Sequence, residues 1–156
     1  MLEEMTQLWL LPEVHYFFLA LFIQGSFLFY DEVVLHRQRG LPPWERWGHP
    51  MDTFFFALPF VSGGFFAASP NVFITLSVLS CLVILKDEWI HHGRINGTEG
   101  FCHGALFVLH PVTLYWGYRN LIASHQMLLQ ASSILLVTLM LTQLIYWNAI
   151  RTPEAR

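Results

Sequence analysis

The sequence predicts an all-α protein, an integral membrane helical bundle with about five transmembrane helices. Three observations support this prediction. Of the 156 residues, 54% are hydrophobic and only 12% are charged, whereas about a quarter of the residues in a soluble domain are charged. The mean hydropathy is positive, at +0.46. The apolar residues also gather in long runs, which is the pattern of helices that cross a bilayer.

Five apolar runs are the predicted spans, and together they take up most of the chain, so we expect a single domain over residues 1–156. The first run is not expected to be a cleaved signal peptide, because it lacks a basic leader and ends in acidic residues. The predicted spans are Val14–Val34, Met51–Ala68, Val72–Ile90, Phe101–Trp116 and Met127–Ile150.

Turn and cap residues separate these runs. Gly40-Leu41-Pro42-Pro43 predicts a rigid turn after the first span. His49-Pro50 predicts the start of the second helix, because proline needs no N–H donor in a first turn. Ser69-Pro70-Asn71 predicts a short turn before the third span, and Thr98 predicts an N-cap for the fourth.

The distribution of basic residues predicts the orientation in the membrane. With five spans, seven of the eight basic residues fall on one side, which the positive-inside rule assigns to the cytoplasm. We therefore expect an outside N-terminus and a cytoplasmic C-terminus, as in a bacterial inner membrane protein. The formal net charge of −3 argues against a nucleic-acid partner. The seven residues are Arg37, Arg39, Arg46, Lys86, Arg94, Arg151 and Arg156.

Histidines and carboxylates gather at the predicted cytoplasmic ends of the first four spans. Burying so many ionisable groups in a membrane is costly, and metal ligation is one way to offset the cost. Because one metal ion cannot take them all, we expect two ions in a site built from four helices. The candidate ligands are Glu32, His36, His49, Asp52, Glu88, His91, His92, Glu99, His103 and His110.

The spacing of these residues favours a shared site. Glu32 and His36 are four residues apart, as are Glu99 and His103, so each pair lies on one face of an α-helix. His110 continues the second of these stripes. A weak repeat, Asp-Glu-Val-Val-Leu-His near residue 31 and Asp-Glu-Trp-Ile-His-His near residue 87, predicts two similar helical hairpins that face each other.

Other polar residues are expected to play supporting roles. Asp31 and Asp87, with Arg37 and Arg39, are predicted to orient the ligands or to form interfacial salt bridges. Four further residues are expected to be structural rather than ligands, namely His15, His125, Cys81 and Cys102. The mixture of imidazole and carboxylate suits iron, with zinc or manganese as alternatives, and the lack of positioned thiolates argues against an iron–sulfur cluster.

This pattern resembles the histidine-rich membrane diiron enzymes, which include fatty-acid desaturases, alkane hydroxylases and carotenoid hydroxylases. It carries one adjacent histidine pair, His91-His92. The segment Glu88-Trp89-Ile90-His91 also resembles the Glu-x-x-His motif of ferritin-like diiron oxidases. The resemblance covers the site pattern rather than the whole chain. It implies a diiron oxidoreductase that acts on a hydrophobic small molecule, with membrane lipid around it and a separate electron donor.

Three other functions remain open from the residues alone. A zinc-dependent membrane hydrolase similar to ceramidases would hold zinc with three histidines and activate water with a carboxylate. A metal or ion transporter would extend polar groups through the bilayer. A haem protein would use two histidines but would leave the carboxylates unexplained.

Overall fold

The computed structural model describes residues 11–39, 41–86 and 97–151, and this part of the chain is helical without any strand. The all-α prediction is confirmed, and one long helix lies over each predicted apolar run. The helices are α2 (Pro12–Tyr30) with its π-helical continuation η1 (Asp31–His36), the short α3 (Arg37–Arg39), α4 (Glu45–Phe65), α5 (Pro70–Ile84), α7 (Gly97–Ile122), and α8 (Gln126–Ile145) with its π-helical continuation η2 (Tyr146–Ile150).

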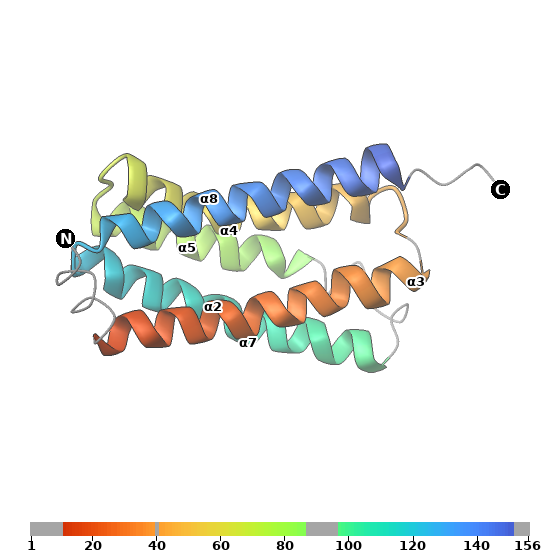
Figure 1. The fold of residues 1–156 in the computed structure, drawn as a ribbon, viewed down its shortest axis with the longest axis horizontal. Coiled ribbons are helices and arrows are strands. Elements are labelled where there is room, and N and C mark those ends of the chain that lie inside the picture. The colour runs from red at the N-terminus through yellow and green to blue at the C-terminus, as the bar shows by residue number, and fades with distance from the viewer. Residues whose placement is uncertain (1–10, 40, 87–96, 152–156) are drawn as a thin grey trace.

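The long helices lie side by side along the long axis of the molecule (Figure 1). The most extensive packing joins α4 to α8, and the next joins α2 to α7. The chain reverses direction at each connection, so η1, the start of α4, the start of α7 and η2 lie toward the same end of the bundle. This placement agrees with the predicted gathering of polar helix ends at one level.

Two segments are long and apolar enough to cross a membrane, namely Pro12–His36 and Gln126–Ile150, and α5 is a shorter apolar helix. By length and composition, therefore, the described residues support fewer than the five predicted spans. The helices α4 and α7 carry more polar residues, and several of these are buried, although Arg119 of α7 is exposed. In α7, Glu99, His103 and Asn120 are buried, whereas Phe101 and Val108 are about two-thirds exposed.

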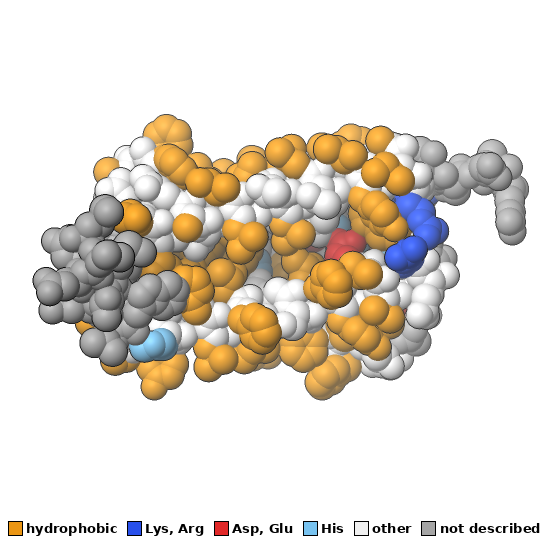
Figure 2. Space-filling model, in the orientation of Figure 1, with side chains coloured by type: hydrophobic (Ala, Val, Ile, Leu, Met, Phe, Trp, Pro, Cys, Tyr) orange, Lys and Arg blue, Asp and Glu red, His pale blue; other side chains and the backbone are white. Residues whose placement is uncertain are grey.

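The surface of the bundle is largely hydrophobic on the face seen in Figure 2. Large apolar side chains are exposed along the bundle, including Phe22 at 73% and Phe66 at 76%. The apolar core lies nearer the other end from the polar helix ends and is rich in phenylalanine. Phe17 contacts Phe60, and Phe60 contacts Phe73, with ring centroids 5.8 Å apart in both pairs. These contacts tie α2, α4 and α5 together.

Candidate metal centre

Four buried residues form the centre of a candidate metal site. Asp31 and His36 come from η1, and Glu99 and His103 come from the first turns of α7. Each offers one ligand atom, and these four atoms lie within 4.8 Å of one another. The two ring nitrogens of His36 lie between two carboxylates, with Nδ1 3.3 Å from Asp31 Oδ2 and Nε2 3.3 Å from Glu99 Oε1. Such a cluster could hold a metal ion.

The π-helical turn explains why Asp31 joins this group. In an α-helix, residues five apart lie roughly 140° apart around the axis, so Asp31 and His36 would point in different directions. A π-helix bonds each residue to the one five positions along, and residues with that spacing stack on one face. Asp31 therefore faces His36, and Asp31 Oδ2 is also 3.6 Å from His103 Nε2. The structure therefore places Asp31 within the candidate ligand group, whereas the sequence suggested a supporting role.

A second group shares His36 and adds two residues from α4. Ligand atoms of His36, Glu45 and His49 also lie within 4.8 Å of one another, and Glu45 is buried. The rings of His36 and His49 are in contact, with centroids 4.6 Å apart. Three helical segments thus each contribute one carboxylate and one histidine, and His36 joins the two groups.

Glu45 reaches the site because α4 begins earlier than expected. The helix starts at Glu45 rather than at His49-Pro50. Pro50 lacks the N–H that would bond to the carbonyl oxygen of Arg46. The side chain of Asn148, from η2, donates a hydrogen bond to that oxygen at 3.3 Å. The additional helical turn places Glu45 and His49 on one face, four residues apart.

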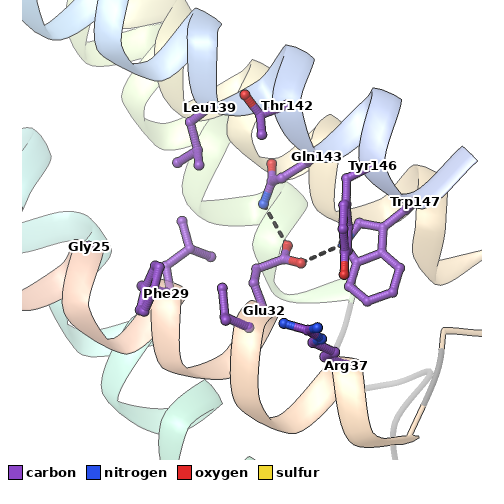
Figure 3. A pocket seen from close by; sticks show the side chains of 11 residues that line it. Gly25, Phe29, Glu32, Arg37, Leu139, Thr142, Gln143, Tyr146 and Trp147 are labelled. Carbon is purple, nitrogen blue, oxygen red and sulfur yellow. Dashed lines mark hydrogen bonds between the residues drawn. The ribbon is translucent and has the colours of Figure 1, made fainter. Parts of the chain in front are cut away.

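Glu32, a predicted ligand, is instead held by the last turns of α8 and by η2. Its Oε1 accepts a 2.6 Å hydrogen bond from the Gln143 side chain, and its Oε2 accepts one of 2.6 Å from the Trp147 indole. Figure 3 shows both donors pointing at this carboxylate. Oε1 is also 3.4 Å from His49 Nδ1. Glu32 is therefore placed to orient the His49 ring, as carboxylates behind metal-bound histidines commonly do.

Substituting Trp147 tests this orienting role. The change Trp147→Phe keeps a ring but removes the N–H donor to Glu32, so we expect metal affinity to fall about 10-fold, the lower end of the range for outer partners of a metal ligand. A chelator-competition titration measures the change. Trp116→Phe is the matched control, because Trp116 stacks on Tyr16, and neither residue belongs to the metal-ligand groups. Equal affinities in the two variants would contradict the role of Glu32.

Two other predicted ligands belong to neither group. Asp52 forms a salt bridge with Lys86 of the short segment after α5. His110 is buried deeper in the bundle, where its Nε2 is 2.8 Å from Ser80 Oγ and its Nδ1 is 3.4 Å from Gln24 Nε2. Both ring nitrogens of His110 therefore have partners from neighbouring helices. His110 connects α2, α5 and α7 rather than extending the metal-ligand stripe.

We predict that His110→Ala lowers stability without changing metal content. The substitution removes the partner of buried Ser80 and Gln24, and each unsatisfied buried group costs about 1–3 kcal/mol. Thermal unfolding in detergent measures the loss, and elemental analysis of the same sample measures the metal. A fall in metal stoichiometry with unchanged unfolding temperature would place His110 in the metal site.

The structure thus brings four of the ten predicted ligands into the two groups, namely His36, His49, Glu99 and His103. Glu32 lies directly behind His49. Asp52 lines a small cavity beside His49 but pairs with Lys86, and His110 lies deeper in the bundle. Glu88, His91 and His92 fall outside the described residues. Sequence reasoning missed Glu45, although Glu45-Arg46-Trp47-Gly48-His49 has the same Glu-x-x-x-His spacing as residues 32–36 and 99–103. That repeated spacing was the available signal.

The donor set fits a divalent transition metal. Three carboxylates buried close together would repel one another, and a bound cation would compensate their charge. Asp31 Oδ1 is buried and has no hydrogen-bond partner among the described residues, so it is available to a ligand. A small cavity of about 50 Å³ borders Asp31, His49 and His103. The candidate ligands therefore border a space large enough for a water molecule.

Comparison with protein-family models, with curated proteins and with solved structures gives no match. The function is therefore inferred from the chain's own residues and geometry.

Proposed function

We propose that this protein is an integral membrane oxidoreductase that holds two metal ions, iron in the active form, and oxidises a substrate dissolved in the bilayer. The observation that carries the proposal is the pair of ligand groups joined by His36. One group contains two histidines and two carboxylates, and the other contains two histidines and one carboxylate. The second composition is that of non-haem iron sites with open coordination positions.

The number of ligands favours two ions over one. A single four-coordinate zinc site needs three protein ligands and a water, whereas the three carboxylate–histidine pairs here offer six. Paired carboxylates and histidines on facing helices are the usual way in which helical bundles hold two metals. Iron bound by these residues would supply the electrons for oxygen reduction. A separate donor would have to restore those electrons.

The membrane location is supported by the direction in which the side chains point. The apolar segments Pro12–His36 and Gln126–Ile150 flank helices that bury Glu45, Glu99 and His103 and expose large apolar side chains. We infer that all five long helices cross the bilayer, with α4 and α7 hiding their polar faces inside. By the positive-inside rule, the basic residues favour a cytoplasmic location for this end, where a soluble electron donor could reach it.

Oxygen consumption tests the oxidoreductase proposal. The detergent-purified full chain is loaded anaerobically with ferrous iron, exposed to oxygen and followed by an oxygen electrode. We expect uptake in proportion to bound iron, and no such uptake in a zinc-loaded sample. Protein that binds iron without consuming oxygen would contradict the oxidoreductase function. Protein that retains only zinc and cleaves an amide lipid would support the hydrolase instead.

A further inference from the structure

A network of buried polar side chains connects α8 to the candidate metal ligand His49. Its members Thr53, Gln143 and Glu32 are all buried. Thr53 Oγ1 donates a 2.7 Å hydrogen bond to Gln143 Oε1, and Gln143 Nε2 donates one of 2.6 Å to Glu32 Oε1. Glu32 Oε1 in turn lies 3.4 Å from His49 Nδ1. The network therefore runs from α4 to α8, on to η1, and back to α4.

Chemistry fixes the direction of each hydrogen bond in this network. The indole N–H of Trp147 can only donate, and it occupies Glu32 Oε2 at 2.6 Å. If the Gln143 amide were turned round, its oxygen would face Glu32 Oε1 and two acceptors would meet at the 2.6 Å contact. Thr53 supplies its hydroxyl hydrogen to the amide oxygen from the other side. Gln143 therefore holds its N–H toward Glu32 (Figure 3).

Glu32 consequently acts as an acceptor toward His49. Both of its oxygens already accept an N–H group, so a hydrogen bond to the His49 ring requires the hydrogen on Nδ1. At 3.4 Å, a small rotation of the ring completes this bond. A neutral imidazole has one N–H and one acceptor nitrogen, so the lone pair of Nε2 is left for a metal ion. A carboxylate behind a metal-bound histidine commonly fixes the tautomer in this way.

We propose that Thr53 and Gln143 are positioning residues for the second ligand group, to which His49 belongs. Together they hold Glu32 as the acceptor for Nδ1–H of His49 and so direct Nε2 to the metal ion. Thr53 belongs to neither ligand group and acts through the amide of Gln143. The inference rests on the proposed metal centre, but the tautomer of His49 can be measured without metal.

Nitrogen NMR of the metal-free full chain in detergent tests the tautomer. The histidine ring nitrogens are labelled, and the His49 signals are identified by their loss in His49→Gln. We expect the hydrogen on Nδ1. Thr53→Val keeps the side-chain shape but leaves the buried Gln143 Oε1 without its donor, which is unfavourable. We therefore expect the amide to turn away from Glu32 and the Nε2–H form to appear. Thr53→Ser restores the hydroxyl and should give the signals of the unchanged protein.

Metal affinity tests whether Thr53 acts through Gln143. In a chelator-competition titration with ferrous iron, we expect Thr53→Val and Gln143→Leu each to lower the affinity about 10-fold, as for other outer partners of a metal ligand. The double variant should lose no more than Gln143→Leu alone, because the effects of residues in one hydrogen-bond network do not add. Thr113→Val is the matched control and should keep the affinity, since Thr113 is a buried threonine of α7 outside the network.

An Nε2–H tautomer in the unchanged protein would overturn the inference, and this measurement does not depend on the stability of any variant. It would equally be overturned if folded Thr53→Val kept the tautomer of the unchanged protein, or if the losses of affinity added in the double variant. Circular dichroism shows whether each variant is folded. A failure of the proposed function is distinguishable, because protein that binds iron without consuming oxygen would still show the Nδ1–H tautomer and its response to Thr53→Val.

Discussion

Replacing His36 with alanine is expected to abolish metal binding. His36 belongs to both ligand groups and is fully buried between Asp31 and Glu99. Loss of an outer partner of a metal ligand alone costs 10–100-fold in affinity, so loss of this shared ligand should lower the affinity by more than about 100-fold. Elemental analysis of the purified protein and titration against a chelator measure the effect.

His15→Ala is the control for this substitution. His15 is an exposed histidine on α2, the helix that η1 continues, and it is not part of either ligand group. It should therefore keep the metal content of the unchanged protein. Circular dichroism of His36→Ala shows whether the helices remain. Folded His36→Ala protein that retains full metal content would rule out the two groups as the binding site.

Replacing Gly64 with leucine is expected to destabilise the fold strongly. A Cβ atom at Gly64 would lie 2.8 Å from the backbone nitrogen of Gln130 and 3.0 Å from the backbone carbon of Leu129. Backbone atoms cannot rotate away, so α4 and α8 would have to separate. The Gly64 carbonyl oxygen also accepts hydrogen bonds from the side chains of Gln126 and Gln130, at 3.0 and 2.9 Å.

We expect Gly64→Leu to cost about 3 kcal/mol or more, at or above the upper end for overpacking, because the obstacle is backbone. Thermal unfolding in detergent, followed by circular dichroism, measures the loss. Gly104→Leu is the control, because no neighbouring atom lies within 4 Å of its added Cβ. Equal unfolding temperatures for the two variants would show that the close approach of α4 and α8 is not required.

The helical fold was predictable because its signal is strong and local. Long apolar runs separated by Pro and Gly turns define helices, and the alternation of direction along the chain brings their polar ends together. The membrane assignment is harder to read from hydropathy. Helices α4 and α7 bury Glu45, Glu99 and His103, so an average over a window of residues underestimates how apolar their outer faces are.

The two candidate ligand groups were only partly predictable, because they depend on local helix geometry. In a regular α-helix, Glu32 would lie on the same face as His36. The π-helical turn instead directs Asp31 toward His36, and Glu32 accepts a hydrogen bond from α8. A helix that began at Pro50 would not include Glu45. In the structure the helix begins earlier, and Asn148 donates a hydrogen bond to the Arg46 carbonyl oxygen, which has no N–H partner at Pro50. Glu32 and the Arg46 carbonyl oxygen both have hydrogen-bond partners in α8 or η2. Such contacts between helices cannot be read from the spacing of residues within one helix.

His110 illustrates the same limit. Its offset of seven from His103 places the two on one helical face, and the prediction of a shared site followed from that face alone. The distance along the axis, roughly 10 Å at 1.5 Å per residue, puts His110 at a different depth. There Ser80 and Gln24 bind its ring. Two residues on the same face of a helix therefore share a site only if they also lie at the same depth in the bundle.

The number of metal ions bound per chain decides whether the two ligand groups form a dinuclear centre. It is measured by elemental analysis on the full chain, purified in detergent from cells grown with iron and dialysed against a weak chelator. We expect two metal ions per chain, bound by nitrogen and oxygen ligands in X-ray absorption spectra of the same sample. A ratio near one would contradict the dinuclear centre. A ratio near zero after supply of iron, zinc and manganese, or a metal bound through sulfur, would contradict any metal centre built from these residues.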